Sequence, residues 1–275
     1  MDYLSLSPGL AAVTGFALLQ SVMTVLWLLS LAVRDASIVD RFWGLGFVLL
    51  AWFYLVSSPG AAPDAARLVL PFAVTVWAVR LSMHIHLRNR GHGEDYRYAA
   101  MRSHHGSRFP IVSLFTVFLL QGGILWVVAM PLLAAARGAT PGSADSSALL
   151  DAVFAAGLIV WTIGFAFESI GDAQLARHRA DPARSGAVLD TGLWAYTRHP
   201  NYFGDSVVWW GIWLMSVASG GAWTIFSPAI MTLLLLRVSG VALLEKSLKQ
   251  RRPDYAAYVE RTPAFFPRRP RSRAR

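Results

Sequence analysis

Long apolar segments place the tightest constraint on this fold. Each is long enough, or nearly so, to cross a hydrocarbon core of about 30 Å as a helix that rises about 1.5 Å per residue. Lipid offers no hydrogen-bond partners, so a spanning segment must satisfy its backbone groups internally, as a helix does. The sequence therefore predicts an all-α, polytopic integral membrane protein with seven transmembrane helices. We expect the spans at residues 8–33, 42–58, 66–87, 110–136, 148–171, 204–219 and 222–244.

Composition agrees with a membrane protein and excludes several chemistries. Hydrophobic residues make up 55% of the chain and charged residues only 15%, which is unusual for a soluble domain. Cysteine is absent, so disulfides, thiolate metal sites and cysteine nucleophiles are excluded. The motifs HExxH, GxGxxG and GxxxxGK[ST] are also missing. We expect no metal site, and we expect the adjacent His104 and His105 to lie on the surface.

Basic residues gather on alternate loops. Arginines cluster in the loops after the third and fifth spans and in the C-terminal tail, whereas the loops after the second and fourth spans carry only Arg67 and Arg137. Because cytoplasmic loops carry the excess positive charge, this pattern places the N-terminus outside and the C-terminus in the cytoplasm. It also accounts for the net charge of +9 without nucleic acid as a partner, and it predicts that the tail either is disordered or lies on anionic membrane lipid.

Polar side chains concentrate on the cytoplasmic side of the predicted bundle. The interiors of the first, second and fourth spans are nearly free of ionisable groups, unlike the mid-membrane sites typical of channels and transporters. The chemistry therefore falls at helix ends and loops, where a water-soluble cofactor can meet a lipid-soluble substrate.

The stretch GLWAYTRHPNYFGD, residues 192–205, carries most of this polar chemistry. Pro200 favours an extended residue before it and the start of a helix after it. Asn201 and Asp205 then share one helical face, because they are four residues apart. A capped helix accounts only for Pro200 and Asp205, so we predict a binding role for the stretch. Its candidate residues are Tyr196, Arg198, His199, Asn201, Tyr202 and Asp205.

Further candidates surround the third span and the loop after it. The arginines there suit phosphate groups, which a guanidinium can bind with two hydrogen bonds. Membrane topology explains the number of arginines but not the amide, acidic and phenolic side chains among them, so cofactor binding and a topology signal both stay open. Asp40, at the start of the second span, is equally explained as a helix cap. The candidates are Asp40, Asn89, Arg90, Arg97, Tyr98 and Arg102.

Carboxylates near the end of the fifth span form a third group. Glu168 and Asp172 are four residues apart and share a face, where two carboxylates repel unless they are paired or bind a ligand. An ion pair with a buried arginine such as Arg237 is the alternative explanation. Arg179 follows this face, and Glu245 lies on the same face as Arg237 in the last span.

Together these motifs resemble the C-terminal domain of the steroid 5-alpha-reductases. The likeness rests on GLWAYTRHPNYFGD, a following two-span hairpin and a tail with Glu, Lys and Tyr, together with DRFWG and GEDYRYAAMR, and it covers most of residues 35–265. The run Arg-His-Pro-Asn-Tyr-x-Gly is shared with sterol carbon-14 reductases and isoprenylcysteine carboxyl methyltransferases, which bind NADPH and S-adenosylmethionine respectively. The motif thus indicates a nucleotide-bearing cofactor. We expect one membrane domain, 1–275, with a lipid-substrate half at 1–140, a reductase-like half at 148–265 and a basic tail at 266–275.

The resemblance implies cofactor roles for particular positions. Asn89 and Arg90 match an Asn-Arg-Gly at the end of the third span that contacts the cofactor. Asp172 and Arg179 match an Asp and an Arg that hold the nicotinamide-ribose and phosphate portions. The remaining matches are Asn201, Asp205 and Arg237.

The leading prediction is NADPH-dependent reduction of the Δ4 double bond of a 3-oxo-steroid or a similar lipophilic enone, by an oxidoreductase acting on CH–CH groups. Such a reaction needs a hydrogen-bond donor for the enone oxygen, on which negative charge builds. Tyr98 and a protonated Asp40 are alternatives for this donor, and Glu245 is a third catalytic candidate. The choice between NADPH and NADH stays open.

Two other functions remain as alternatives. One is an S-adenosylmethionine-dependent membrane methyltransferase, and the other is a non-enzymatic membrane protein. The arginine-rich loop after the third span favours the reductase, since NADPH needs phosphate ligands and S-adenosylmethionine does not. We expect a monomer in a bacterial inner membrane, with the active site facing the cytoplasm.

Overall fold

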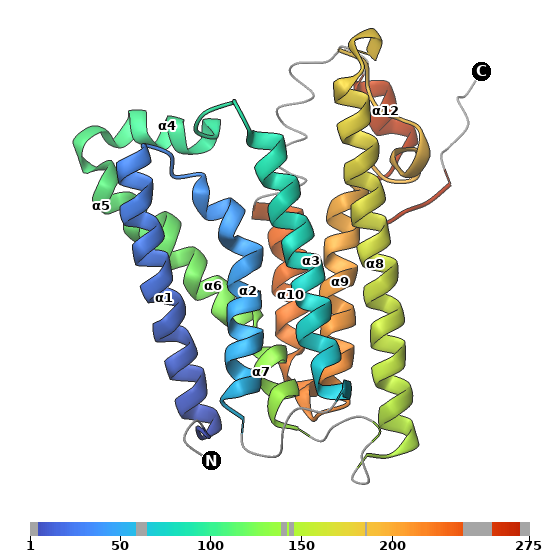
Figure 1. Ribbon diagram of the computed structural model, residues 1–275. Helices are drawn as coiled ribbons and strands as arrows, with labels where there is room; N and C mark the ends of the chain where they lie inside the picture. The colour runs from blue at the N-terminus through green and yellow to red at the C-terminus, as the bar shows by residue number, and fades with distance from the viewer. Residues whose placement is uncertain are drawn as a thin grey trace. The chain divides into compact units, whose positions relative to one another are not determined.

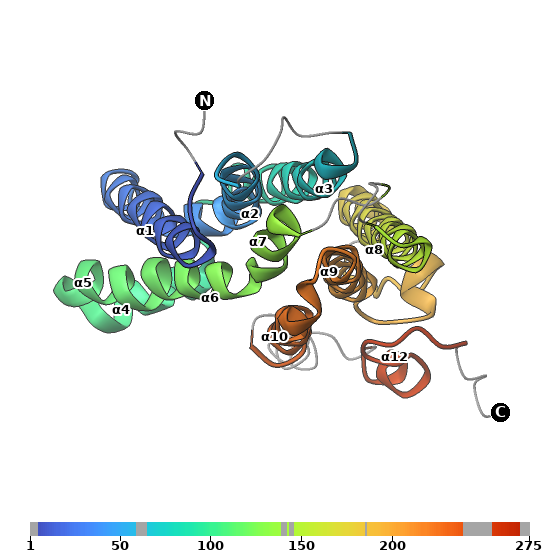
Figure 2. The ribbon, with the colours of Figure 1, turned by 90° about the horizontal axis from the view of Figure 1, so that it is seen from below.

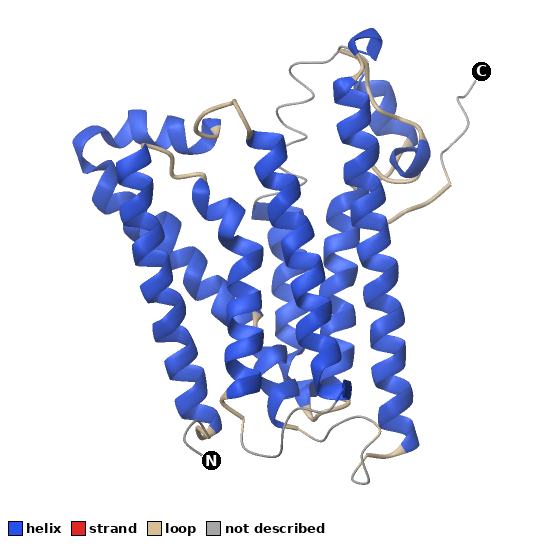
Figure 3. Cartoon of the chain, in the orientation of Figure 1, coloured by secondary structure: helices blue, strands red, loops and turns tan. Residues whose placement is uncertain are grey.

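The computed structural model describes residues 5–58, 65–138, 142, 146–184, 186–238 and 255–269. Every regular element in these ranges is a helix (Figure 3), which confirms the all-α prediction. Five of the helices there are long and apolar enough to cross a membrane, so the chain is an α-helical membrane protein. They are Pro8–Val33, Ile38–Val56, Arg67–Asn89, Tyr96–Arg137 and Ala148–Ala180.

The chain divides into two compact units. Unit 1 comprises Met1–Phe154 with Met215–Thr224, and unit 2 comprises Ala155–Leu214 with Ile225–Arg275. The segment Met215–Thr224 groups with unit 1, although the residues on either side of it belong to unit 2. The expected single membrane domain with its two halves stays a prediction.

Unit 1 is built around α2 (Ile38–Val56), which lies beside α1 (Pro8–Val33) and α3 (Ala65–Asn89) (Figures 1 and 2). Helix α2 also packs against α6 (Leu120–Val128) and α7 (Met130–Arg137). Large apolar side chains from these helices fill the centre of the unit, so α2 forms its core. The fully buried ones include Leu19, Met23, Phe47, Leu50, Tyr54, Trp77 and Phe118.

The span expected at 110–136 is a series of short helices rather than one regular helix. After a 3-10 turn, η1 (Gly106–Arg108), α5 (Phe109–Ser113) runs into a π-helix, η2 (Leu114–Leu119), and then into α6. Helix α7 restarts with Pro131 in its first turn, where a missing backbone N–H costs no hydrogen bond. The apolar pattern predicts the segment but does not distinguish π turns from α turns.

The basic loop expected after the third span contains a further helix, α4 (Tyr96–His105). Asp95 caps it, because its Oδ1 accepts a hydrogen bond from the backbone N–H of Arg97 at 3.0 Å. Gly106 ends it with a positive φ of 52°, a conformation that glycine adopts readily. Helix α4 therefore holds Arg97 and the residues that follow it in fixed positions.

Unit 2 contains most of α8 (Ala148–Ala180), which begins in unit 1, together with α9 (Pro200–Val217) and α10 (Phe226–Leu233). Helix α9 begins at Pro200, as predicted, whereas α8 runs past its predicted end at residue 171. The shorter helices of this part of the chain are η3 (Pro182–Arg184), η4 (Gly192–Ala195), η5 (Gly221–Ile225), the π-helix η6 (Leu234–Val238) and α12 (Tyr255–Arg261).

Glycines allow α8 and α9 to meet backbone to backbone. A Cβ atom on Gly164 would lie 2.5 Å from the backbone nitrogen of Val208, and one on Gly204 would lie 2.4 Å from the backbone nitrogen of Glu168. Small residues of this kind let membrane helices pack closely. The same buried face of α8 continues to Glu168 and Asp172, so the seam brings these carboxylates to the first turns of α9.

The last two predicted spans are not among the five long apolar helices. Helix α9 has 18 residues, which is long enough, but it is not apolar enough over that length. The segment predicted at 222–244 largely coincides with a shorter apolar helix, Gly221–Arg237. The part of that segment after Val238 lies outside the described residues.

Replacing Gly164 by alanine is expected to lower the free energy of unfolding by about 1–3 kcal/mol, the usual cost of overpacking, because the new Cβ meets the backbone of α9. Thermal unfolding of the purified full chain in detergent measures the change. Gly123→Ala on α6 is the matched control, because a Cβ there meets nothing within 4 Å. Equal unfolding midpoints for the two variants would contradict the close approach of α8 and α9.

Candidate functional site

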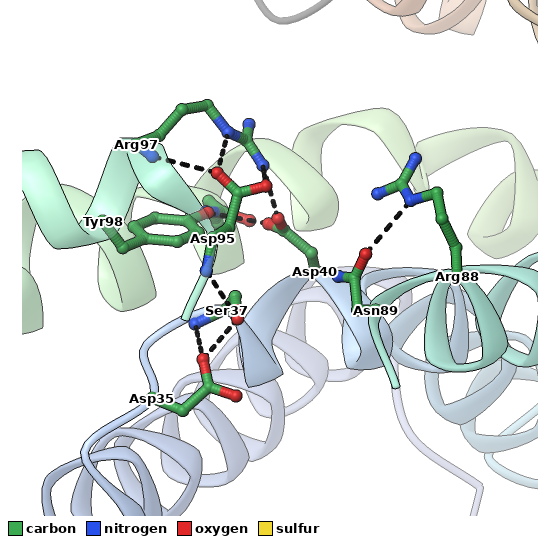
Figure 4. Close-up of polar contacts among 9 residues, drawn as sticks. Asp35, Ser37, Asp40, Arg88, Asn89, Asp95, Arg97 and Tyr98 are labelled. Atoms are coloured by element: carbon green, nitrogen blue, oxygen red, sulfur yellow. Dashed lines mark hydrogen bonds and ion pairs between the residues drawn. The ribbon is translucent and has the colours of Figure 1, made fainter. Parts of the chain in front are cut away.

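Two clusters of polar side chains stand out, one in each unit. The first, the Tyr98 cluster, comprises Asp40, Arg97 and Tyr98, which Figure 4 shows, together with Gln121. The buried phenol of Tyr98 donates to Asp40 Oδ1 at 2.7 Å, and Arg97 Nη2 donates to Asp40 Oδ2 at 2.7 Å. The amide Nε2 of Gln121 lies 3.3 Å from the phenolic oxygen. This arrangement joins the first turn of α2 to α4 and α6.

The connection between α1 and α2 holds this cluster in place. The backbone N–H of Ala36 donates to Glu94 Oε1 at 2.8 Å, and the backbone N–H of Asp95 donates to Ser37 Oγ at 3.4 Å (Figure 4). These bonds tie the start of α2 to the residues just before α4. Asp40 and Tyr98 therefore meet because the turns before their helices are joined.

Two ion pairs support the start of α4. Glu94 accepts from Arg102 through both carboxylate oxygens, at 2.8 and 2.9 Å. Burial raises the pKa of the Glu94 carboxyl, but the hydrogen bonds from Arg102 and Ala36 outweigh burial and hold this pKa below its usual value. Burial likewise raises the pKa of Asp95, and the two hydrogen bonds from Arg97 outweigh it in the same way.

These contacts change the interpretation of two predicted phosphate ligands. Arg97 bonds to Asp95 and Asp40, and Arg102 bonds to Glu94. Both guanidinium groups thus have carboxylate partners inside unit 1, and a cofactor phosphate would have to compete with these partners. Their role in cofactor binding stays a prediction.

The end of α3 presents the other predicted residues of unit 1. Asn89 Oδ1 accepts from Arg88 Nε at 3.1 Å (Figure 4). Arg90 is exposed, and its guanidinium pairs with no carboxylate in the part of the chain that the structure describes. Unlike Arg97 and Arg102, Arg90 could therefore bind a phosphate without first giving up a carboxylate partner among the described residues.

The second cluster, the Asn201 cluster, comprises Glu168, Asp172, Asn201 and Asp205. The three carboxylates are buried, and α8 and α9 bring them together along the glycine seam. Asn201 Nδ2 donates to Asp172 Oδ1 at 3.0 Å. Asn201 Oδ1 is buried and accepts no hydrogen bond from the described residues. An amide acceptor in this position suits an N–H or O–H group of a ligand.

The loop before α9 is fastened by the segment Tyr255–Arg268, which we call the C-terminal strap. Arg198 is buried, and its guanidinium donates to the carbonyl oxygens of Val259 and Thr262, while its backbone N–H donates to Pro263 O at 2.9 Å. Arg198 thus joins this loop to the strap, and its role as a cofactor ligand stays a prediction. Further contacts are Tyr258 Oη to Trp194 O, Thr197 Oγ1 to Phe265 O and the Arg268 N–H to Tyr196 O.

The other predicted residues of unit 2 lie around this loop. The ring of the buried His199 stacks on Tyr202, with centroids 5.5 Å apart, and the side chain of Tyr196 is exposed. Arg179, in the last turn of α8, and Arg237, in η6, are both exposed. Glu245 lies outside the described residues.

Sequence reasoning missed Gln121 and the strap contacts of Trp194 and Tyr258. A lone glutamine in an apolar span is itself a signal, because polar groups at membrane depth are costly and usually have a partner. The strap carried no such signal, since its bonds go mainly to backbone carbonyl groups.

Glu94→Gln is expected to lower the free energy of unfolding by about 1–3 kcal/mol near pH 7, because the amide replaces a charged acceptor of Arg102 and Ala36. The pKa of Glu94 is lowered in the folded protein. Its contribution is therefore present above the ordinary carboxyl pKa of about 4.3 and is lost as the pH falls through the lowered folded value. The stability difference between wild type and variant should narrow in acid.

Thermal unfolding in detergent at about pH 7 and about pH 3.5 checks this expectation. Glu260→Gln on α12 is the control, because Glu260 forms no ion pair within the described ranges. A difference between wild type and Glu94→Gln that does not change with pH would contradict the role assigned to the ionised carboxylate.

Comparison with known proteins places the chain in a family. Residues 26–262 match the family described as "Protein of unknown function (DUF1295)". The uncharacterized protein C594.04c of Schizosaccharomyces pombe is 25% identical over 282 residues, covering 93% of this chain and 79% of the yeast protein. No solved structure matches. Because the family match spans most of its length, the chain belongs to the DUF1295 family.

Proposed function

We propose that this protein reduces the polarised carbon–carbon double bond of a lipophilic enone, such as the Δ4 bond of a 3-oxo-steroid, with NADPH as the hydride donor. The observation that carries the proposal is the buried phenol of Tyr98, held by Asp40 in the company of Arg97. Hydride addition to an enone builds negative charge on the carbonyl oxygen, and a positioned hydrogen-bond donor stabilises that charge.

Tyr98 suits the donor role better than Asp40. Both oxygens of Asp40 accept hydrogen bonds, one from Tyr98 and one from Arg97. This arrangement matches an ionised carboxylate, whereas a donor to substrate would have to be the neutral acid. In the proposed reaction the Tyr98 hydroxyl turns from Asp40 to the enone oxygen, and Arg97 keeps the carboxylate paired.

The Asn201 cluster fits a nicotinamide dinucleotide. The acceptor Asn201 Oδ1 is buried and accepts no hydrogen bond from the described residues, so a carboxamide N–H or a ribose hydroxyl would satisfy it. Asp172 orients that amide through a 3.0 Å hydrogen bond. When bound, NADPH supplies the hydride for the β-carbon of the enone, and water supplies the proton for the α-carbon.

A methyltransferase that uses S-adenosylmethionine is the second candidate, and one observation favours it. Arg97, Arg102 and Arg198 all bond to internal acceptors, so fewer arginines are left to bind phosphate than the sequence suggested. The Tyr98 cluster argues the other way, because methyl transfer to a carboxylate needs no proton donor. The reductase therefore remains our proposal.

We also propose the finer topology and setting of the enzyme. The resemblance to steroid 5-alpha-reductases supports seven spans, with α9 and the segment at 222–244 as the sixth and seventh. The distribution of arginines supports an N-terminus outside and an active site facing the cytoplasm. A bacterial inner membrane, lipid as a neighbour and a monomeric state complete the proposal.

NADPH should raise the thermal unfolding midpoint of the detergent-purified protein, since a ligand that binds only the folded state stabilises it. The Asn201→Ala variant should bind NADPH at least about tenfold more weakly, because it loses both the acceptor and the hydrogen bond to Asp172. Titration with NADPH, NADH and S-adenosylmethionine measures the three affinities.

Thr162→Val is the matched control for unit 2, because its exposed hydroxyl bonds only to Leu158 O of its own helix. It should bind NADPH as the wild type does. If S-adenosylmethionine alone stabilises the protein, the reductase proposal is wrong and the methyltransferase is supported. Wild-type NADPH affinity in Asn201→Ala would remove the Asn201 cluster from the cofactor site.

Tyr98→Phe should lower kcat for enone reduction by about 10²–10³-fold, the typical effect of losing one donor to an oxyanion. Its affinity for NADPH should be unchanged, since Tyr98 is proposed to contact only the enone. NADPH oxidation followed at 340 nm with testosterone or progesterone as substrate measures the rate. An unchanged kcat would exclude Tyr98 as the donor.

A further inference from the structure

Gln121 is a polar side chain in a largely apolar stretch, Leu114–Val128, and it contacts the proposed catalytic phenol. We propose that Gln121 is a positioning residue for Tyr98, and that its amide donates a hydrogen bond which makes the phenol a stronger donor to the substrate carbonyl. This inference rests on the proposed enone reduction, and it adds a residue that neither the motifs nor the resemblance singled out.

The hydrogen atoms available to the cluster fix the direction of this bond. A tyrosine hydroxyl has a single hydrogen. The 2.7 Å bond to the carboxylate of Asp40 uses it, and that bond is shorter than the 3.3 Å contact with Gln121. The phenolic oxygen is then left with lone pairs only, so the amide must present its N–H₂ group. Gln121 donates and Tyr98 accepts.

Donation to the phenolic oxygen has a chemical consequence. As the Tyr98 hydroxyl gives its hydrogen bond to an enone oxygen that is gaining charge, negative charge develops on the phenolic oxygen as well. An N–H aimed at that oxygen stabilises the charge, and linked hydrogen bonds of this kind polarise one another. Gln121 therefore acts through Tyr98 and need not touch the substrate.

The fold holds Gln121 in place through the irregular helix around it. Buried positions along this segment include Ser113, Val117, Phe118, Gly122 and Leu125. The π-helix η2 (Leu114–Leu119) ends two residues before Gln121. A π turn of this kind inserts one residue and re-aims the side chains after it, and such turns are frequent at functional sites. Gln121 directly precedes Gly122, which is buried.

Helix α1 fixes the register of the re-aimed segment. Gln20 Nε2 on α1 donates to Leu119 O at 3.1 Å. Gly122 lies so close to α1 that a Cβ on it would come within 3.0 Å of the side chain of Met23. The backbone on either side of Gln121 is therefore anchored, and its amide can be held toward α4.

The test compares three variants of the full-length protein in detergent, with NADPH and testosterone. Gln121→Leu should lower kcat about tenfold, which is the effect of one lost hydrogen bond, and should leave the affinity for NADPH unchanged. Gln121→Glu keeps the size of the side chain. Its protonated carboxyl can donate to Tyr98 and its ionised form cannot, so its activity should be present at low pH and lost as the carboxyl ionises. Thr116→Val is the control, because the exposed Thr116 hydroxyl donates to Val112 O, one turn earlier, and to no other described residue.

The outcomes separate this inference from the proposed function. A normal kcat in Gln121→Leu beside a low kcat in Tyr98→Phe would overturn the role of Gln121 alone. So would a Gln121→Glu enzyme whose rate follows the wild-type pH profile, because a packing role gives no extra titration. If Gln121→Leu does not fold, the Gln121→Glu profile decides the matter. No enone-dependent NADPH oxidation by the wild type would overturn both proposals.

Discussion

A charge placed at the end of an apolar helix needs a partner within reach, because an unpaired ion beside hydrocarbon is costly. This requirement organises the polar end of unit 1. Arg97 is matched by Asp40 and Asp95, and Arg102 by Glu94. The pairs join α2 to α4 and leave the phenol of Tyr98 buried against a carboxylate. The chemistry that we propose depends on this pairing, since Arg97 keeps the Asp40 carboxylate paired when the Tyr98 hydroxyl turns to the substrate.

Much of the architecture could be predicted from the apolar pattern, and the misses have identifiable causes. Hydropathy located α1, α2, α3 and most of α8 because a lipid-spanning helix has few alternatives. It missed α4, which is short and polar, although Asp95 followed by Tyr96 and Arg97 is a capping signal. It also could not foresee the π-helix η2, since an α-helix of the same residues would look equally apolar.

Spacing in the sequence indicated which residues share a helical face better than it indicated which distant residues they contact. Spacing along a helix correctly placed Glu168 and Asp172 on one buried face. Such reasoning could not predict the hydrogen bond between Asp172 and Asn201. The two residues are 29 positions apart and meet because glycines let α8 and α9 pack closely. The arginines illustrate the same limit. Their number suggested phosphate, but distant carboxylates decide whether a guanidinium is available, and Asp40 lies 57 residues before Arg97.

The C-terminal strap also determines when the loop before α9 can reach its final structure during synthesis. Tyr258, whose hydroxyl bonds to the carbonyl of Trp194, is synthesised 64 residues after it. At about 5–20 residues per second, the ribosome needs about 3–13 s to add those residues. During that interval the loop that carries Arg198 has emerged or is emerging without the carbonyl groups that later hold it. The helices that precede the strap are thus made first, and a nascent chain cannot complete the loop until the strap has been synthesised.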